Sequence, residues 1–227
     1  MKNEFLPVDA AYDRWSAFYD TYENPMVFMA NHVVSQGEIA RLAHGADVFE
    51  FGCGTGRNLA VLEAAGARSV AGRDFSDGML AVARARNASW DLGVYNMLTP
   101  PVDRADSSAD LVLFSLTLEH IGDLRLPLAE ARRILRLGGT VAVIEIHPYL
   151  SRSGVAAHFD DGDVEVRMPV YAHQFGDYLN AFATCGLQVR ACREWTPALA
   201  GHPLELAHMK NGPEFPLSVE FLLQASS

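Results

Sequence analysis

The sequence predicts an α/β fold, in which a doubly wound, Rossmann-like and mostly parallel sheet carries helices on both faces. Short apolar runs rich in Val, Ile and Phe alternate along the chain with Ala- and Leu-rich stretches of helical spacing. A glycine-rich turn follows the first apolar run of this series. Regular strand–helix alternation implies parallel strands joined by right-handed crossovers, and such sheets bind their ligands at the carboxyl ends of the strands.

Seven strands are expected, five before Pro148 and two after it. The predicted strands are residues 47–51, 69–73, 92–95, 110–115, 140–147, 187–195 and 217–224. The predicted helices between them are residues 57–65, 77–87, 124–135 and 174–185.

Two segments stand outside this alternation. Residues 4–44 have helical spacing interrupted at Pro25, which predicts an N-terminal helical annex within residues 1–44. Residues 149–172 predict an inserted loop or short hairpin on the substrate side. We find no repeat, low-complexity run or linker, so a single domain over residues 1–227 is expected.

Composition narrows the functional classes. The 227 residues are 49% hydrophobic and 20% charged, as in folded globular proteins. No apolar run approaches the ~20 residues of a membrane helix, and the N-terminus lacks a signal-peptide stretch, so a cytoplasmic protein without a membrane partner is expected. The net charge of −10 disfavours nucleic acid and favours a neutral or cationic small molecule. Three scattered cysteines indicate neither a disulfide framework nor a zinc site.

The turn in "VFEFGCGTGRNL" is a candidate ligand cradle. Gly52, Gly54 and Gly56 follow a strand and precede a helix, an arrangement that presents backbone amides and a helix N-terminus to a ligand. The closing glycine of the dinucleotide fingerprint is absent, since Leu59 stands there, and no Walker lysine follows. A tight turn without a ligand is the alternative.

An acid at the end of the second strand supports the cradle. Asp74 lies where doubly wound folds place a ribose-binding carboxylate. The alternative is a helix N-cap formed together with Ser76 and Asp77, and the two roles are compatible.

Four segments in this order and spacing resemble the class I methyltransferases that use S-adenosylmethionine: "VFEFGCGTGRNL", "GRDFSDGML", "ADLVLFSLTLEHI" and "ARRILRLGGTVAVIEIHP". The resemblance covers roughly residues 47–148, and the tail is similar to the last helix and strands of the family. It implies S-adenosylmethionine as cofactor and S-adenosylhomocysteine as product.

The resemblance also implies which residues contact the cofactor. These residues are Tyr19, Glu50, Gly52, Cys53, Gly54, Gly56, Asp74, Phe75, Met79, Asn96, Met97 and Ser115. Glu50 and the glycine turn would hold the methionine part, Asp74 the ribose, and Phe75 and Met79 would flank the adenine. Asn96 replaces the usual Asp, although its carbonyl oxygen still accepts a hydrogen bond. Arg73 replaces an apolar residue of the family, and the sequence offers no explanation for it.

Histidine is the natural candidate for a general base. Methyl transfer from a sulfonium is an in-line displacement, so the protein mainly positions the nucleophile and excludes water. A hydroxyl or protonated amine as nucleophile also benefits from a base that titrates near neutral pH. The candidates are His147, at the end of the fifth strand, then His120 and His173. Each has a purely structural role as its alternative. Glu119 is expected to be structural.

Two further groups of residues have alternative interpretations. Aromatic residues near the N-terminus predict either a lid over the cofactor or helix-to-sheet packing, and these are Tyr12, Trp15, Phe18, Tyr19 and Tyr22. The acids at 160, 161 and 163 indicate a solvated turn, so no metal is expected.

Together these features predict a methyltransferase that acts on an O or N atom of a small organic molecule, plausibly a biosynthetic intermediate, as a monomer or homodimer. One alternative is a cofactor-binding catalyst of a non-methylating reaction such as cyclisation. The other is a binding module without enzymatic activity, against which the intact glycine turn and Asp74 argue.

Overall fold

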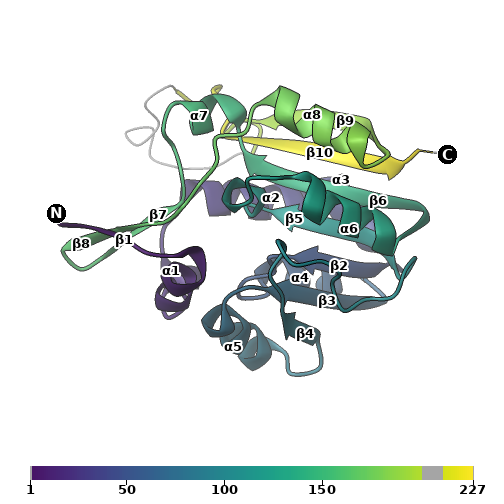
Figure 1. Cartoon of the computed structure of the whole chain (residues 1–227), viewed down its shortest axis with the longest axis horizontal. Coiled ribbons are helices and arrows are strands. Elements are labelled where there is room, and N and C mark those ends of the chain that lie inside the picture. Colours follow the sequence, from purple (N-terminus) through teal and green to yellow (C-terminus); the bar gives the residue numbers. More distant parts are fainter. Residues whose placement is uncertain (1, 201–211, 227) are drawn as a thin grey trace.

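The computed structural model describes residues 2–200 and 212–226, and its centre is a seven-stranded sheet in the order β4-β3-β2-β5-β6-β10-β9 (Figure 1). The strands are β2 (Asp47–Phe51), β3 (Ser69–Asp74), β4 (Asp91–Val94), β5 (Ala109–Ser115), β6 (Leu135–Ile146), β9 (Leu187–Trp195) and β10 (Ser218–Ala225). The pairs from β4 to β6 are parallel, and β10 is antiparallel to both β6 and β9. The predicted fold class is confirmed.

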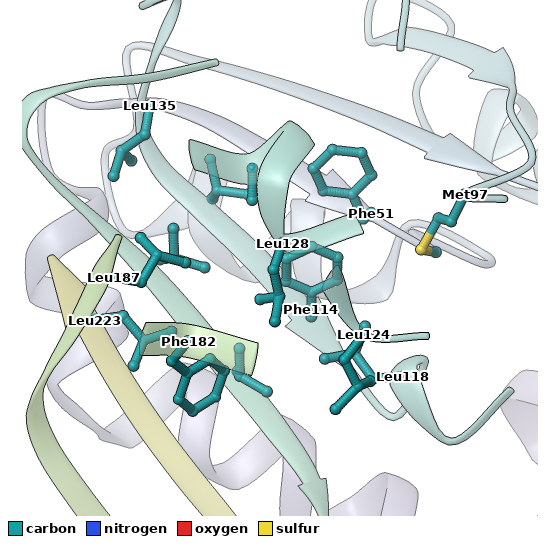
Figure 2. Packing of buried hydrophobic residues seen from close by; sticks show 14 of the residues in the cluster. Phe51, Met97, Phe114, Leu118, Leu124, Leu128, Leu135, Phe182, Leu187 and Leu223 are labelled. Atoms are coloured by element: carbon teal, nitrogen blue, oxygen red, sulfur yellow. The ribbon is translucent and has the colours of Figure 1, made fainter. Parts of the chain in front are cut away.

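Helices cover both faces of this sheet (Figure 1). One face packs against α2 (Pro25–Gln36), α3 (Glu38–Ala43), α4 (Arg57–Ala64) and α5 (Asp77–Arg86). The other packs against α6 (Arg125–Ile134) and α8 (Phe175–Thr184), whose apolar side chains meet the sheet in Figure 2. Side chains alternate along a strand, so in β2 Val48 faces the first group of helices while Phe49 and Phe51 face the second.

A second, three-stranded sheet lies beside the large one, in the order β1-β8-β7. The inserted segment forms a short helix, α7 (Pro148–Arg152), and a hairpin of β7 (His158–Asp161) and β8 (Val164–Arg167). The expectation of helix from residue 4 onward is wrong at its start, because β1 (Lys2–Phe5) pairs with β8 in parallel. Helix α1 (Val8–Trp15) and the single turn η1 (Tyr19–Thr21) follow.

Helix length also bears on membrane insertion. Within residues 2–200 and 212–226, no helix is both long and apolar enough to cross a membrane.

Candidate active site

The glycine turn forms the floor of a cavity at the carboxyl ends of β2, β3 and β5. Gly52, Gly54 and Gly56 all have left-handed backbone conformations, with φ of 69°, 53° and 73°. Gly52 and Gly54 line the cavity. A Cβ added to Gly54 would meet no atom within 4 Å, whereas one added to Gly52 would lie 2.5 Å from the Thr117 side chain. Gly54 therefore leaves open space in which a ligand can approach the backbone.

Glu50 lies beneath this turn with one carboxylate oxygen unsatisfied. Its side chain is 1% exposed, and its Oε1 accepts a hydrogen bond from Asn58 Nδ2 at 2.7 Å. Its Oε2 has no partner. Burial raises the pKa of Glu50 to about 8, against the opposing effect of the Asn58 hydrogen bond. An unpartnered buried carboxylate oxygen is costly unless a donor, ideally a cationic one, reaches it.

Asp74 lies at the end of β3 and lines the same cavity. Its Oδ2 accepts from the Gly54 amide at 2.8 Å and its Oδ1 from the Ser76 amide at 2.9 Å. Burial raises its pKa, although these amide hydrogen bonds act in the opposite direction. Ser76 is the N-cap of α5, so the capping role belongs to Ser76, and Asp74 braces both the cap and the glycine turn.

Most of the remaining predicted cofactor residues surround the cavity. Those that line it are Tyr19, Phe75, Met79, Asn96, Met97 and Ser115. The side-chain carbonyl of Asn96 accepts from the Leu98 amide at 2.9 Å, so it also shapes its own loop. Three predicted residues do not line the cavity, namely Glu50, which is buried near the end of β2, Cys53 and Gly56. Cys53 is buried against Gly72, and a Cβ at Gly56 would clash with Trp90 at 2.5 Å.

Helix α1 and the η1 turn contribute wall residues to this cavity, and polar contacts hold both against the large sheet's helices and the glycine turn. Asp13 accepts from the Ser76 hydroxyl at 2.6 Å and from the Gly78 amide at 2.9 Å, at the start of α5. Asp20 accepts from the Thr55 hydroxyl at 2.7 Å beside the glycine turn. Of the aromatic N-terminal residues, Tyr12 and Tyr19 line the cavity, and the group also packs together, with Trp15 stacked on Phe159.

Residues 49–143 match the family model described as the methyltransferase domain. The demethylmenaquinone methyltransferase of Clavibacter sepedonicus is 34% identical over 145 residues, which span 61% of this chain and 57% of that protein. A Mycolicibacterium smegmatis protein named as an S-adenosylmethionine-dependent methyltransferase is 38% identical over 119 residues, 51% of this chain and 44% of that protein. The matched part thus spans about half the length of these relatives.

Solved structures show the same fold. An S-adenosylmethionine-dependent methyltransferase from Mesorhizobium loti superposes with a TM-score of 0.64 at 19% identity, covering 82% of this chain and 96% of that one. The CcbJ methyltransferase from Streptomyces caelestis has a TM-score of 0.66 at 17% identity, covering 96% and 98%. The described chain therefore has the fold of these methyltransferases, and its residues 49–143 match the methyltransferase-domain family. The four segments that carry the sequence resemblance all converge on the cavity or its supports.

Of the three candidate histidines, only His120 lines the cavity above the glycine turn. His120 Nδ1 lies 2.9 Å from the Pro169 carbonyl, which only accepts, so this nitrogen carries the proton. Nε2 of the neutral ring then accepts from the Tyr12 hydroxyl at 2.9 Å. Burial lowers the pKa of His120, which keeps the ring neutral and basic at pH 7.

His147 and His173 lie elsewhere in the described structure. His147 Nε2 contacts Glu194 Oε1 at 2.8 Å, and its Nδ1 accepts from the Tyr149 amide at the start of α7. Both nitrogens are thereby engaged by the protein, and His147 lines neither cavity described here. His173 Nε2 contacts the Ile121 carbonyl at 2.8 Å, and the ring lines a shallow surface hollow beside α6. Position at the end of a strand favoured His147 in the sequence, but its side chain turns toward β9.

Arg73 has a structural explanation. Its guanidinium donates to the Asp91 carboxylate at 3.0 Å and to the Gly72 and Asp91 carbonyls, and it lies over the Phe49 ring at 5.9 Å. Because side chains alternate along β3, Arg73 points away from the cavity that Asp74 faces. It therefore links β3 to β4 and takes no part in the cofactor cavity.

A second cavity adjoins the first. Tyr12, Tyr19 and Leu116 line both, so they form the boundary between the two. Leu116 has a φ of 53°, a strained conformation for a residue with a branched side chain, and such strain concentrates at functional sites. Glu119 lines the second cavity and accepts from the Ala157 amide at 3.3 Å, so it is structural in part only.

Sequence reasoning missed several cavity residues. Val8 and Asp9 belong to no motif and reach the site only through the fold, whereas Thr117 and Ile121 lie within "ADLVLFSLTLEHI" without having been singled out. Glu145 supports the cavity wall without lining the cavity. Its Oε1 accepts hydrogen bonds from the amides of the two residues after Leu116, and these bonds hold that loop in place. Its position in the "VIEIH" strand, as a lone acid among apolar residues, was the available signal.

Proposed function

We propose that this protein binds S-adenosylmethionine in the cofactor cavity and transfers its methyl group to an O or N atom of a small organic molecule. Two observations carry the proposal: the buried, unpartnered Oε2 of Glu50, two residues before the glycine turn, and the open space at Gly54, which lines the cavity. The cofactor has a cationic methionine end, and a buried acid without a cationic partner is the chemistry that receives it.

The residues present fit the cofactor part by part. The buried Glu50 and the amides of the glycine turn would hold the methionine end. Asp74, which lines the cavity, would accept from the ribose hydroxyls. Phe75, Met79 and the side chains at 96 and 97 offer apolar and amide contacts to a planar base. When bound, the group supplies an electrophilic methyl.

The protein's part in the reaction is to position the acceptor, exclude water and accept a proton. Helix α1 would exclude water as part of the cavity wall, and the His120 ring lies behind the Tyr12 hydroxyl at that wall. His120 is therefore the general base of the proposal in place of His147. Demethylmenaquinone methyltransferases among the relatives support a ring-containing small molecule as the acceptor.

Calorimetric titration of the whole chain with S-adenosylmethionine, and separately with S-adenosylhomocysteine, tests cofactor binding. Micromolar binding of either supports the proposal, and the absence of binding of both would contradict it. Methyl-labelled cofactor incubated with acceptors then tests transfer. Label recovered in a product supports methyl transfer, whereas a product formed with intact cofactor would favour the non-methylating alternative.

A further inference from the structure

The second cavity has a different character from the cofactor cavity. Aromatic and aliphatic side chains make most of its wall: Tyr12, Trp15, Tyr19, Tyr22, Pro25, Met26, Val27, Leu116, Ile146 and Val155. No Lys or Arg lines it among the residues described, and its acids are the buried Glu119 and the exposed Glu23 at the rim. Such walls suit a flat, uncharged, aromatic ligand.

Two hydrogen-bonding groups meet at this cavity. The Tyr12 hydroxyl stands at the boundary with the cofactor cavity and is backed by His120 Nε2 at 2.9 Å. Glu119, the neighbour of His120 in the η2 turn (Leu118–His120), is 5% exposed and lines the cavity. The site thus offers a proton acceptor at the boundary between the two cavities and a buried carboxyl group in the second one.

We propose that the second cavity is the acceptor pocket and that it takes an uncharged hydroxylated aromatic ring that also carries a carbonyl group. The hydroxyl meets Tyr12, and the carbonyl meets Glu119. This inference rests on the proposed function, because it names the acceptor of the same methyl transfer.

The proton moves through two hydrogen bonds. The acceptor O–H bond breaks as its proton passes to Tyr12 Oη, while the Tyr12 proton passes to His120 Nε2. His120 becomes an imidazolium whose Nδ1–H still donates to the Pro169 carbonyl. The freed oxygen forms its new bond to the methyl carbon, and the electron pair of the carbon–sulfur bond stays on sulfur. The lowered pKa of His120 and the raised pKa of Tyr12, both due first to burial, fit a neutral relay before the reaction.

Glu119 is suited to donate to a carbonyl. Burial, and next the charge of Glu145, raises the pKa of Glu119 to about 8, so its carboxyl is protonated at pH 7. Its Oε2 accepts from the Ala157 amide. The titratable groups around it are Glu145 on β6, Tyr12, Tyr19, Tyr22 and Glu23 in the N-terminal segment, and His158 on β7.

Direct binding of small probes tests the class. The whole chain, saturated with S-adenosylhomocysteine, is titrated at pH 7 with four naphthalene probes that differ only in substituents: an ortho-acetylnaphthol, the plain naphthol, a naphthoate and a naphthylmethylammonium. The ortho-acetylnaphthol is expected to bind about tenfold or more tighter than either charged probe, and about fivefold tighter than the plain naphthol. Stronger binding of the ammonium or the carboxylate, or binding of none of the four, would overturn the inference.

The pH dependence isolates Glu119. Affinity for the ortho-acetylnaphthol is expected to fall by about tenfold as the pH rises through about 8, because the carboxyl loses the proton that it donates. Glu119→Gln keeps a donor at every pH and should bind the probe with no such fall. The plain naphthol, which lacks the carbonyl, serves as matched control and should show no difference between the wild type and Glu119→Gln. An unchanged pH profile in Glu119→Gln would contradict the role of Glu119.

The variant Tyr12→Phe separates the role of Tyr12 in proton transfer from its role in lining the acceptor pocket. The variant should bind the ortho-acetylnaphthol within about threefold of the wild type but lose methyl transfer to it by about 100-fold or more. Undiminished transfer would contradict the relay. If the wild type does not bind S-adenosylhomocysteine, the proposed function itself is contradicted. Failure of the acceptor-pocket inference and failure of the proposed function are therefore distinguishable.

Discussion

The acidic residues at the two ends of strand β2 differ in whether they form ion pairs. At the amino end Asp47 accepts from Arg68 at 2.7 Å and from Arg136 at 2.8 Å, and Asp110 on β5 shares both arginines. Three residues further along, Glu50 is 1% exposed and forms no ion pair. Among the residues that the structure describes, none of the carboxyl-end acids Glu50, Asp74, Glu119 and Glu145 is paired with Lys or Arg.

The difference separates acids that stabilise the fold from acids that prepare a site. Hydrogen bonds from Arg68 hold the pKa of Asp47 well below its usual range. Burial raises the pKa of Glu50 to about 8 and of Glu145 to about 7. Unpaired acids at the carboxyl end lower the stability of the free protein, and a cationic ligand offsets that cost when it binds.

Removing the cavity acid Asp74 should have the largest effect on ligand binding. Asp74→Ala deletes hydrogen bonds to a charged group, so affinity for S-adenosylmethionine is expected to fall by roughly 1.5–3 kcal/mol. Calorimetric titration measures the change. Asp47→Ala, at the other end of the sheet, is the matched control and should leave the affinity unchanged. Equal losses of affinity in Asp74→Ala and Asp47→Ala would contradict the proposed difference between acids at the two ends of the sheet.

Neutralising Glu50 should stabilise the free protein at high pH. The pKa of Glu50 is about 8 in the folded chain and near 4.5 in the unfolded one, so the folded form holds a proton that the unfolded form has lost between these values. Its contribution to stability is therefore present below about pH 4.5 and lost as the pH rises toward about 8. Glu50→Gln, measured by urea unfolding without ligand, is expected to be roughly 4 kcal/mol more stable than wild type at about pH 8 and close to it near pH 4.5. A difference that is the same at both pH values would contradict this assignment.

Asp47→Ala should act in the opposite direction. It removes acceptors from two arginines, so the free energy of unfolding is expected to fall by roughly 1 kcal/mol near pH 7. The pKa of Asp47 is lowered by folding, so this contribution is present above its usual pKa and disappears as the pH falls through and below that value. Urea unfolding of the wild type and the variant, at pH 7 and at a pH below the usual pKa of an aspartate, measures the size and sign of the change in unfolding free energy. An undiminished change in acid would contradict a contribution from the ion pairs.

The smallest effect is expected at His147. Its side chain caps the short helix α7 and contacts Glu194, away from both cavities. His147→Ala should therefore lower the free energy of unfolding by roughly 0.5 kcal/mol and leave affinity for S-adenosylmethionine unchanged. A weakened affinity for S-adenosylmethionine in this variant would show that His147 contributes to the binding site.

Local pattern was enough to predict the large sheet. The structure gives β2 and β9 the predicted bounds of 47–51 and 187–195, because apolar runs flanked by turns and helical spacing are properties of neighbouring residues. The glycine turn and Asp74 were predictable for the same reason. The strand β1 was not, since its partner β8 lies some 160 residues away in the chain.

The direction of a side chain at the site depended on distant partners. His147 and His120 both follow strands. His147 contacts Glu194 on β9, whereas His120 contacts Tyr12, 108 residues away, at the cavity. Arg73 is explained by Asp91 on the next strand and by Phe49 on the neighbouring one. No spacing rule within one sequence specifies such pairs.

Proton release on cofactor binding tests most directly the claim that the carboxyl-end acids await a cationic ligand. Titration of the wild type with S-adenosylmethionine at pH 7, in buffers of different ionisation enthalpy, gives the number of protons released. We predict about one proton per cofactor bound, because Glu50 is protonated in the free protein and becomes charged against the ligand, and no release in Glu50→Gln. Heat that is independent of the buffer in the wild type, or the same release in both proteins, would contradict the claim.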